Sequence, residues 1–151
     1  MKSHTPLAIV AAASLLGMAS PTLFAHDGEN HDTQKAANGG QLRVAGPYHL
    51  ELVVARDHKE EKEGPLVVHL TDQTGAKVST IGAAGTATIL AGKQKTAATL
   101  VSDGDNRLKG SAKYASTPDM KIVVSVSFAG KTTEQARFTP LAVTKGSKAE
   151  H

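Results

Sequence analysis

The chain has no cysteine and no tryptophan, and only two tyrosines and three phenylalanines among its 151 residues. Without cysteine it can form no disulfide and offers no thiolate ligand or nucleophile, so its stability has to come from packing alone. With so few aromatic residues, a core has to be built mainly from Val, Leu, Ile and Ala. A Gly-x-Ser-x-Gly elbow, a phosphate-binding loop and a His-Glu-x-x-His pair are also missing. We therefore expect a protein that is not an enzyme.

No charge of one sign dominates, because 17 basic residues stand against 14 acidic ones and the formal net charge is +3. The basic residues are spread along the sequence instead of forming a cluster. This spread argues against a nucleic-acid partner, which would call for a basic stripe. The length suits a single domain.

Long hydrophobic runs are absent except near the N-terminus, where residues 7–18 are almost all apolar. Lys2 precedes this run and Ser20-Pro21 follows it, as in a secretory signal peptide. The run is shorter than the roughly twenty residues needed to span a bilayer. We expect residues 1–25 to be cleaved before His26, although a cut before Ser20 fits the small-x-small rule better. The processed chain is then periplasmic and does not span the membrane.

Residues 26–38 are polar and have no apolar periodicity, which predicts a flexible arm. Residues 39–139 alternate between apolar and polar positions in short runs separated by turn residues, a pattern typical of antiparallel strands. Residues 140–151 read as a flexible tail. No segment shows a helical period of useful length.

The turn signals recur about every 8–12 residues, the spacing found in immunoglobulin-like folds. We therefore expect an all-β fold, an immunoglobulin-like antiparallel β-sandwich of seven to nine strands behind a disordered N-terminal arm. Residues 56–63 carry mixed charges and include His58, and we expect them to form a solvated loop. The expected strands cover 41–44, 48–55, 65–71, 77–81, 86–91, 96–101, 107–114, 120–128 and 132–138.

The histidines are the most informative residues, because imidazole beside carboxylate is a typical donor set for divalent zinc, copper or nickel. If cleavage leaves His26 first, its α-amine and imidazole can chelate copper(II) together, with Asp27 and His31 nearby. A solvated polar leader would explain the same residues.

His49 and Glu51 are two residues apart on an expected strand, so they share one face, opposite Tyr48, Leu50 and Leu52. His69 likewise lies opposite Val68 and Leu70 on its strand. If the two strands are neighbours, His49, Glu51 and His69 can converge on a surface metal site. The alternative is that these three are unrelated polar residues scattered over the surface.

Several segments carry a resemblance to a known group of proteins: Asn38-Gly39-Gly40, Tyr48-His49-Leu50-Glu51-Leu52-Val53, Val68-His69-Leu70-Thr71-Asp72, Gly85 to Leu90, Asp105 to Gly110 and Ala136-Arg137-Phe138. In these segments the chain resembles small exported bacterial proteins associated with heavy-metal efflux systems for copper, cobalt, zinc and cadmium. Where many of those proteins have His-Gly-Gly, this chain has Asn38. The resemblance implies export and a link to metal handling.

The leading hypothesis is a periplasmic accessory protein that binds a divalent metal ion and buffers it or delivers it to a heavy-metal efflux complex. Copper(II) is favoured over zinc by the general affinity order, and copper(I) is disfavoured because thiolates are lacking. The alternative is a non-metal β-sandwich interaction module that docks onto an envelope or efflux partner.

Overall fold

The computed structural model describes residues 36–143, which form eight β-strands. The strands are β1 (Gln41–Ala45), β2 (Tyr48–Val54), β3 (Lys62–Asp72), β4 (Ala83–Ala91), β5 (Gln94–Ser102), β6 (Arg107–Tyr114), β7 (Lys121–Phe128) and β8 (Glu134–Phe138). The expected signal peptide, most of the arm, with His26, Asp27 and His31, and residues 144–151 of the tail lie outside the described residues. The described part contains no helix, and hence none long and apolar enough to cross a membrane.

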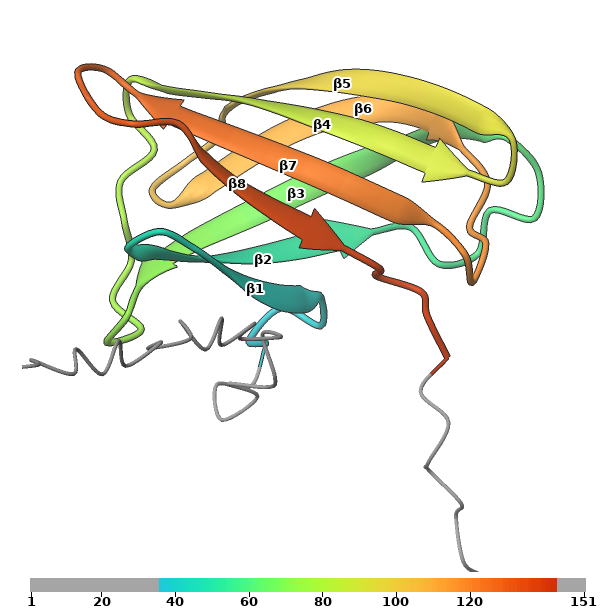
Figure 1. Cartoon of the computed structure of the whole chain (residues 1–151), viewed down its shortest axis with the longest axis horizontal. Coiled ribbons are helices and arrows are strands. Elements are labelled where there is room, and N and C mark those ends of the chain that lie inside the picture. The colour runs from blue at the N-terminus through green and yellow to red at the C-terminus, as the bar shows by residue number, and fades with distance from the viewer. Residues whose placement is uncertain (1–35, 144–151) are drawn as a thin grey trace, which may run out of the picture. The chain divides into compact units, whose positions relative to one another are not determined.

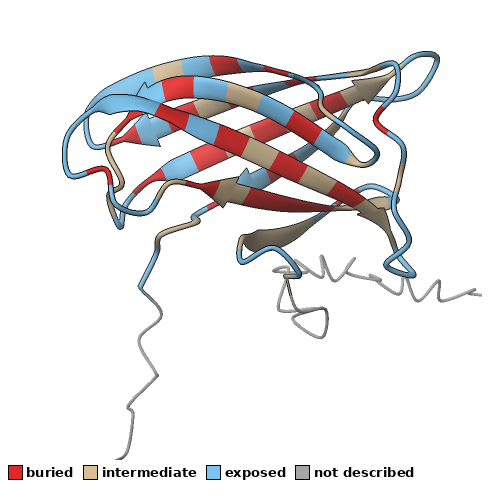
Figure 2. Ribbon diagram, turned by 180° about the vertical axis from the view of Figure 1, so that it is seen from behind, coloured by how far each residue is buried: buried red, intermediate tan, exposed pale blue. Residues whose placement is uncertain are grey.

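The alternation of apolar and polar residues along the chain decides which side of each strand is buried. Figure 2 shows buried and more exposed residues following one another along the strands. On β2, Leu50, Leu52 and Val54 are buried on the inner side, as the sequence predicts, and Tyr48 packs against the same core. The pattern also favours Val68, Leu70, Val124, Val126 and Phe128 as core positions; the first four are fully buried, and Phe128 is partly buried against the core.

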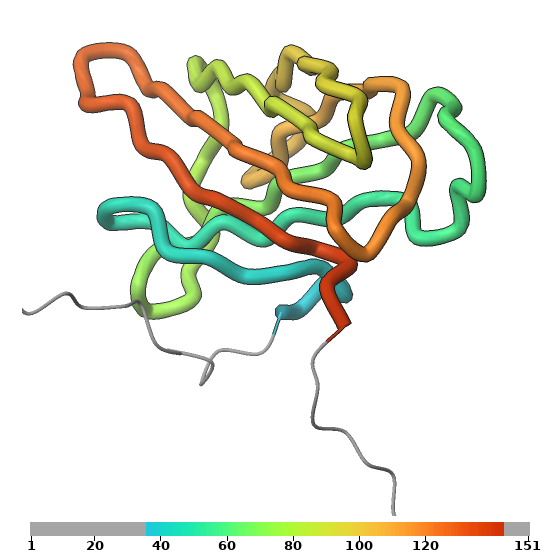
Figure 3. Tube along the Cα trace, turned by 45° about the vertical axis from the view of Figure 1, so that its right-hand side comes forward, coloured from blue at the N-terminus to red at the C-terminus, as the bar shows by residue number. Residues whose placement is uncertain are grey.

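All neighbouring strands are antiparallel, and they follow the order β1-β2-β3-β6-β5-β4-β7-β8 in one sheet (Figure 1). The two edge strands, β1 and β8, come to lie side by side (Figure 3). Gln41 Oε1 accepts a hydrogen bond of 2.7 Å from the backbone N–H of Thr139, just after β8. The sheet is therefore a nearly closed, barrel-like structure around a single apolar interior.

The all-β, antiparallel prediction is confirmed, and eight strands fall within the expected seven to nine. The expected division into two packed sheets is not seen, because every strand belongs to the same sheet. A two-sheet sandwich and a single barrel-like sheet produce the same alternation of apolar and polar residues. In both, one face of the sheet is buried and the other is exposed.

The strand expected at residues 77–81 is wrong. This segment connects β3 to β4, and both strands already have two hydrogen-bonded neighbours. Only an isolated bridge forms, between Thr71 and Lys77, and Val78 N donates to Leu70 O at 3.1 Å. With no free strand edge beside it, the segment crosses as a connection.

Candidate functional site

Glu51 is a buried carboxylate on the outer side of β2, with only 4 % of its surface exposed. Its Oε1 accepts hydrogen bonds from the backbone N–H of Asn38 at 2.8 Å and of Gly40 at 2.9 Å, and its Oε2 accepts one from Asn38 Nδ2 at 3.0 Å. A side chain at Gly40 would collide with Leu52 O, 2.3 Å from the position of its Cβ. Glu51 therefore holds the segment that leads into β1 tightly against β2.

His69 lies directly opposite Glu51 on the neighbouring strand and directly opposite Arg107 on the other side. Burial lowers the pKa of His69 from 6.5; the Glu51 carboxylate opposes this and Arg107 adds to it, both less strongly. The imidazole is therefore neutral at pH 7, the form in which it can bind a metal ion.

His49 shares the outer side of β2 with Glu51, between Val44 on β1 and Thr71 on β3. Its Nδ1 is buried and has no hydrogen-bond partner. Because solvent does not reach Nδ1, a metal ion could use only Nε2 without rearrangement. His49 and His69 are diagonal neighbours, a relation in which residues are typically about 7–8 Å apart.

A groove of about 870 Å³ opens along Glu51 and His69. We call it the Glu51–His69 groove. Ala37 and Asn38 line it at the start of the described chain. Its charged lining residues besides Glu51 lie after the end of β3 or around the start of β6: Lys77, Asp103, Asp105 and Arg107. Acidic, basic and imidazole groups thus face the same open space.

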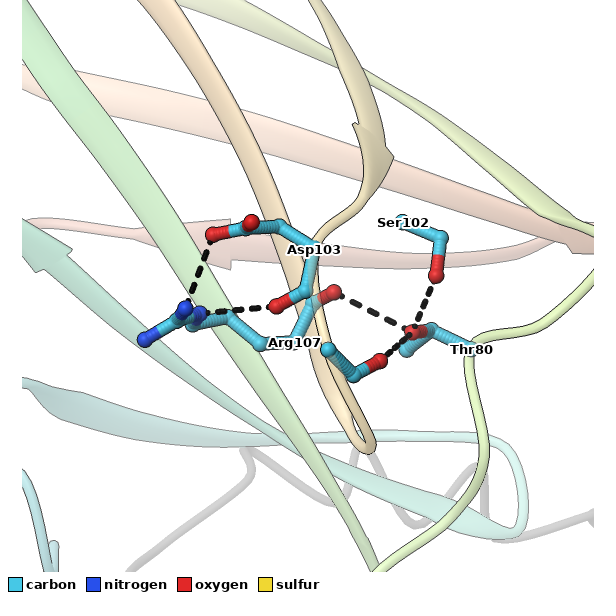
Figure 4. Close-up of polar contacts among 5 residues, drawn as sticks. Thr80, Ser102, Asp103 and Arg107 are labelled. Carbon is cyan, nitrogen blue, oxygen red and sulfur yellow. Dashed lines mark hydrogen bonds and ion pairs between the residues drawn. The ribbon is translucent and has the colours of Figure 1, made fainter.

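One side of this groove is fixed by Thr80, a fully buried polar residue. Its hydroxyl lies within hydrogen-bonding distance of Ser102 Oγ at 2.9 Å, Arg107 O at 3.1 Å and Gly104 O at 3.2 Å (Figure 4). Arg107 in turn forms an ion pair of 2.9 Å with Asp103. Residues 103–106 turn the chain from β5 into β6, and Thr80 ties this turn to the connection between β3 and β4.

The structure brings Glu51 and His69 together, with His49 farther along the same face. Within residues 36–143, however, no three His, Asp or Glu side chains are placed close enough to hold a metal ion. Three of the four lone-pair sites of Glu51 are already engaged by N–H donors. The described domain alone thus offers His69 as its most available ligand, and the predicted ligands His26, Asp27 and His31 lie outside the described residues.

The sequence pattern predicts the wrong environment for His58. It is only 7 % exposed, whereas the mixed-charge run around it predicts a solvated loop. Its ring stacks on Tyr114 with the centroids 5.2 Å apart, and its backbone pairs with Ser116. The only hint in the sequence is Gly64, whose missing side chain leaves room for the imidazole. His58 Nδ1 is buried and has no partner, which makes it a packing residue.

Comparisons with protein-family models, with curated proteins and with solved structures give no match for this chain. The resemblance to exported heavy-metal proteins therefore rests on the sequence segments alone. The structural observation that bears on function is the geometry of the Glu51–His69 groove.

Proposed function

We propose that this chain is an exported, periplasmic protein that binds a divalent metal ion and buffers it or passes it to a heavy-metal efflux complex. Two groups of residues are candidates for the ligands: His26, Asp27 and His31 of the N-terminal segment, and His69 with Glu51 and His49 on the sheet. Copper(II) is the favoured ion, ahead of zinc, because imidazole and carboxylate donors follow the general affinity order of divalent metals.

The observation that supports this proposal best is the anchoring of Asn38 and Gly40 by Glu51. This anchor fixes the start of the described domain to the wall of the groove that holds His69. The groove therefore presents a neutral imidazole, His69, beside the fixed carboxylate of Glu51.

Glu51 and His49 have secondary roles in this proposal. Glu51 holds Asn38 and Gly40 at the wall of the groove, and one lone-pair site of its carboxylate remains for a metal-bound water or the ion itself. His49 can contribute Nε2 from its diagonal position. Asp105 adds negative charge to the groove, which favours a cation there, whereas Asp103 is neutralised by its ion pair with Arg107 and Lys77 adds a positive charge.

The test is a calorimetric titration of copper(II) and zinc into protein purified from the periplasm, with its N-terminus read by intact mass. Removing an imidazole ligand should weaken copper(II) binding by at least about tenfold. That loss in His69→Ala would place the site on the sheet, and the same loss in His26→Ala/His31→Ala would place it on the N-terminal segment. His49→Ala should lose less. His151→Ala is the matched control, because it removes an imidazole that the proposal does not use.

The pH dependence of binding provides a second test, since metal ions bind neutral imidazole. The ordinary histidine pKa is about 6.5, so binding through the N-terminal histidines should weaken between about pH 7.5 and about pH 5.5. The pKa of His69 is lowered, so this ligand should stay available to lower pH. If no variant differs from the wild type, or if copper(II) binds more weakly than about 100 micromolar, the metal proposal fails and the interaction module takes its place.

A further inference from the structure

The outward side of five consecutive strands, β6, β5, β4, β7 and β8, carries no acidic residue. Its charged positions are all basic: Lys95, Arg107, Lys109, Lys113, Lys121 and Arg137. Arg107 is paired with Asp103, but the other five form no ion pair with any described residue. We call this surface the basic face. It is separate from the Glu51–His69 groove, which it borders only at Arg107.

Between the basic residues the face is small and uncharged. Pairing places Thr86 beside Thr99 and Ser125, and Thr88 beside Ala97 and Val123. These short side chains produce an even surface, and no aromatic residue points outward from it. Neither the Glu51–His69 groove nor the hollow lined by Lys77, Ser79 and Ile81 lies on the central part of this face.

Two exposed aliphatic side chains complete the pattern. Leu90 is 43 % exposed and lies directly opposite Lys95 and Lys121. Val101 is 58 % exposed and lies directly opposite Lys109. Each apolar group thus stands beside a lysine, whose aliphatic stem can lie along it while the ammonium group extends outward.

We propose that the part of the basic face around β5, with Lys95, Lys109, Leu90 and Val101, docks reversibly onto an anionic lipid surface. Such a surface supplies a broad plane of negative charge and requires neither a pocket nor close shape complementarity, and each basic residue near it adds to the attraction. The exposed Leu90 and Val101 suit the boundary between headgroups and acyl chains. An outer sheet surface without aromatics lacks the stacking platforms that bind single-stranded nucleic acid and the aromatic anchors typical of protein interfaces.

The experiment is co-sedimentation of the periplasmic protein with vesicles of phosphatidylcholine containing one third phosphatidylglycerol, and with vesicles of pure phosphatidylcholine. Binding should occur only to the anionic vesicles at about 0.05 M salt and should be lost at about 0.5 M, where screening shortens the range of the charges. Lys95→Gln/Lys109→Gln should lower the partition coefficient by roughly 10- to 30-fold, or about fivefold per lysine.

Lys59→Gln/Lys77→Gln is the matched control, because it removes the same charge outside the basic face and should change binding by about twofold or less. Equal losses in the two double variants would show that net charge alone is responsible, and would overturn the proposal. The absence of binding to anionic vesicles at low salt would overturn it as well.

Duplex DNA and polyglutamate test soluble polyanions, and binding to either that is as tight as to vesicles would contradict the assignment to lipid. None of these outcomes depends on metal binding.

Discussion

At the scale of single residues, Glu51 shows how an acidic side chain on an outer face can be structural. The carboxylate accepts three hydrogen bonds, two of them from the backbone N–H groups of Asn38 and Gly40. Hydrogen bonds to a charged acceptor are among the stronger ones in proteins. Glu51 therefore fixes the position at which the N-terminal segment meets the Glu51–His69 groove.

We expect Glu51→Gln to lower the free energy of unfolding by about 1–3 kcal/mol. The reason is that the amide –NH₂ of glutamine would face N–H donors, leaving at least one of them unsatisfied. Urea denaturation followed by circular dichroism measures the loss. Glu61→Gln makes the same chemical change on an exposed residue and should stay within about 0.5 kcal/mol of the wild type. Equal effects of the two substitutions would contradict the anchoring role of Glu51.

At the scale of an element, the loop between β2 and β3 is held by side chains from the far end of β6. Tyr114 Oη donates a hydrogen bond to Pro65 O at 2.7 Å and accepts one from the backbone N–H of Ala55 at 3.0 Å. Burial raises the pKa of Tyr114, so its hydroxyl keeps its proton at neutral pH. His58 stacks on the same ring. The loop is thereby a packed corner of the fold.

Tyr114→Phe should destabilise this corner by about 1–3 kcal/mol, because Ala55 N–H and Pro65 O both lose their partner. The change in unfolding free energy can be read from urea denaturation. Tyr48→Phe is the matched control, since no hydrogen bond to the Tyr48 hydroxyl is found among the described residues, and it should cost about 0.5 kcal/mol or less. If Tyr114→Phe is as stable as the wild type, the corner is held by ring packing instead.

At the scale of the whole molecule, one sheet encloses one interior. Side chains from both ends of the strand order meet there: Tyr48 of β2 and Phe128 of β7 have ring centroids 5.3 Å apart. Residues of β1 to β8 all contribute to the same buried cluster. Damage to this shared core should therefore affect the entire domain, and unfolding should be a single cooperative transition.

Leu52→Ala should lower the free energy of unfolding by about 2–5 kcal/mol, because Leu52 is fully buried and its loss leaves a cavity. Leu90→Ala removes the same atoms from the outer side of β4 and should cost much less. Thermal and urea denaturation of both variants provide the comparison. An equal cost for the two substitutions would contradict the assignment of inner and outer sides.

The sequence by itself determined most of the strand content and, within those strands, the side to which each side chain points. Side chains alternate across a strand, so the placement of Leu50 and Leu52 inside and of His49 and Glu51 outside could be read from the order of residues. It also indicated that β2 and β3 could bring His69 to Glu51, although it could not supply their register. These features are local, since they depend on residues one or two positions apart.

Only the tertiary structure decided which strands are neighbours, and the remaining features follow from that choice. Closing one sheet brought β1 beside β8, left residues 77–81 without a strand edge, and buried His58 against Tyr114. It also gathered lysines that are spread along the sequence onto the basic face. Contacts between residues far apart in sequence depend on how the strands are arranged in space, and an alternating pattern is compatible with both a sandwich and a barrel-like sheet.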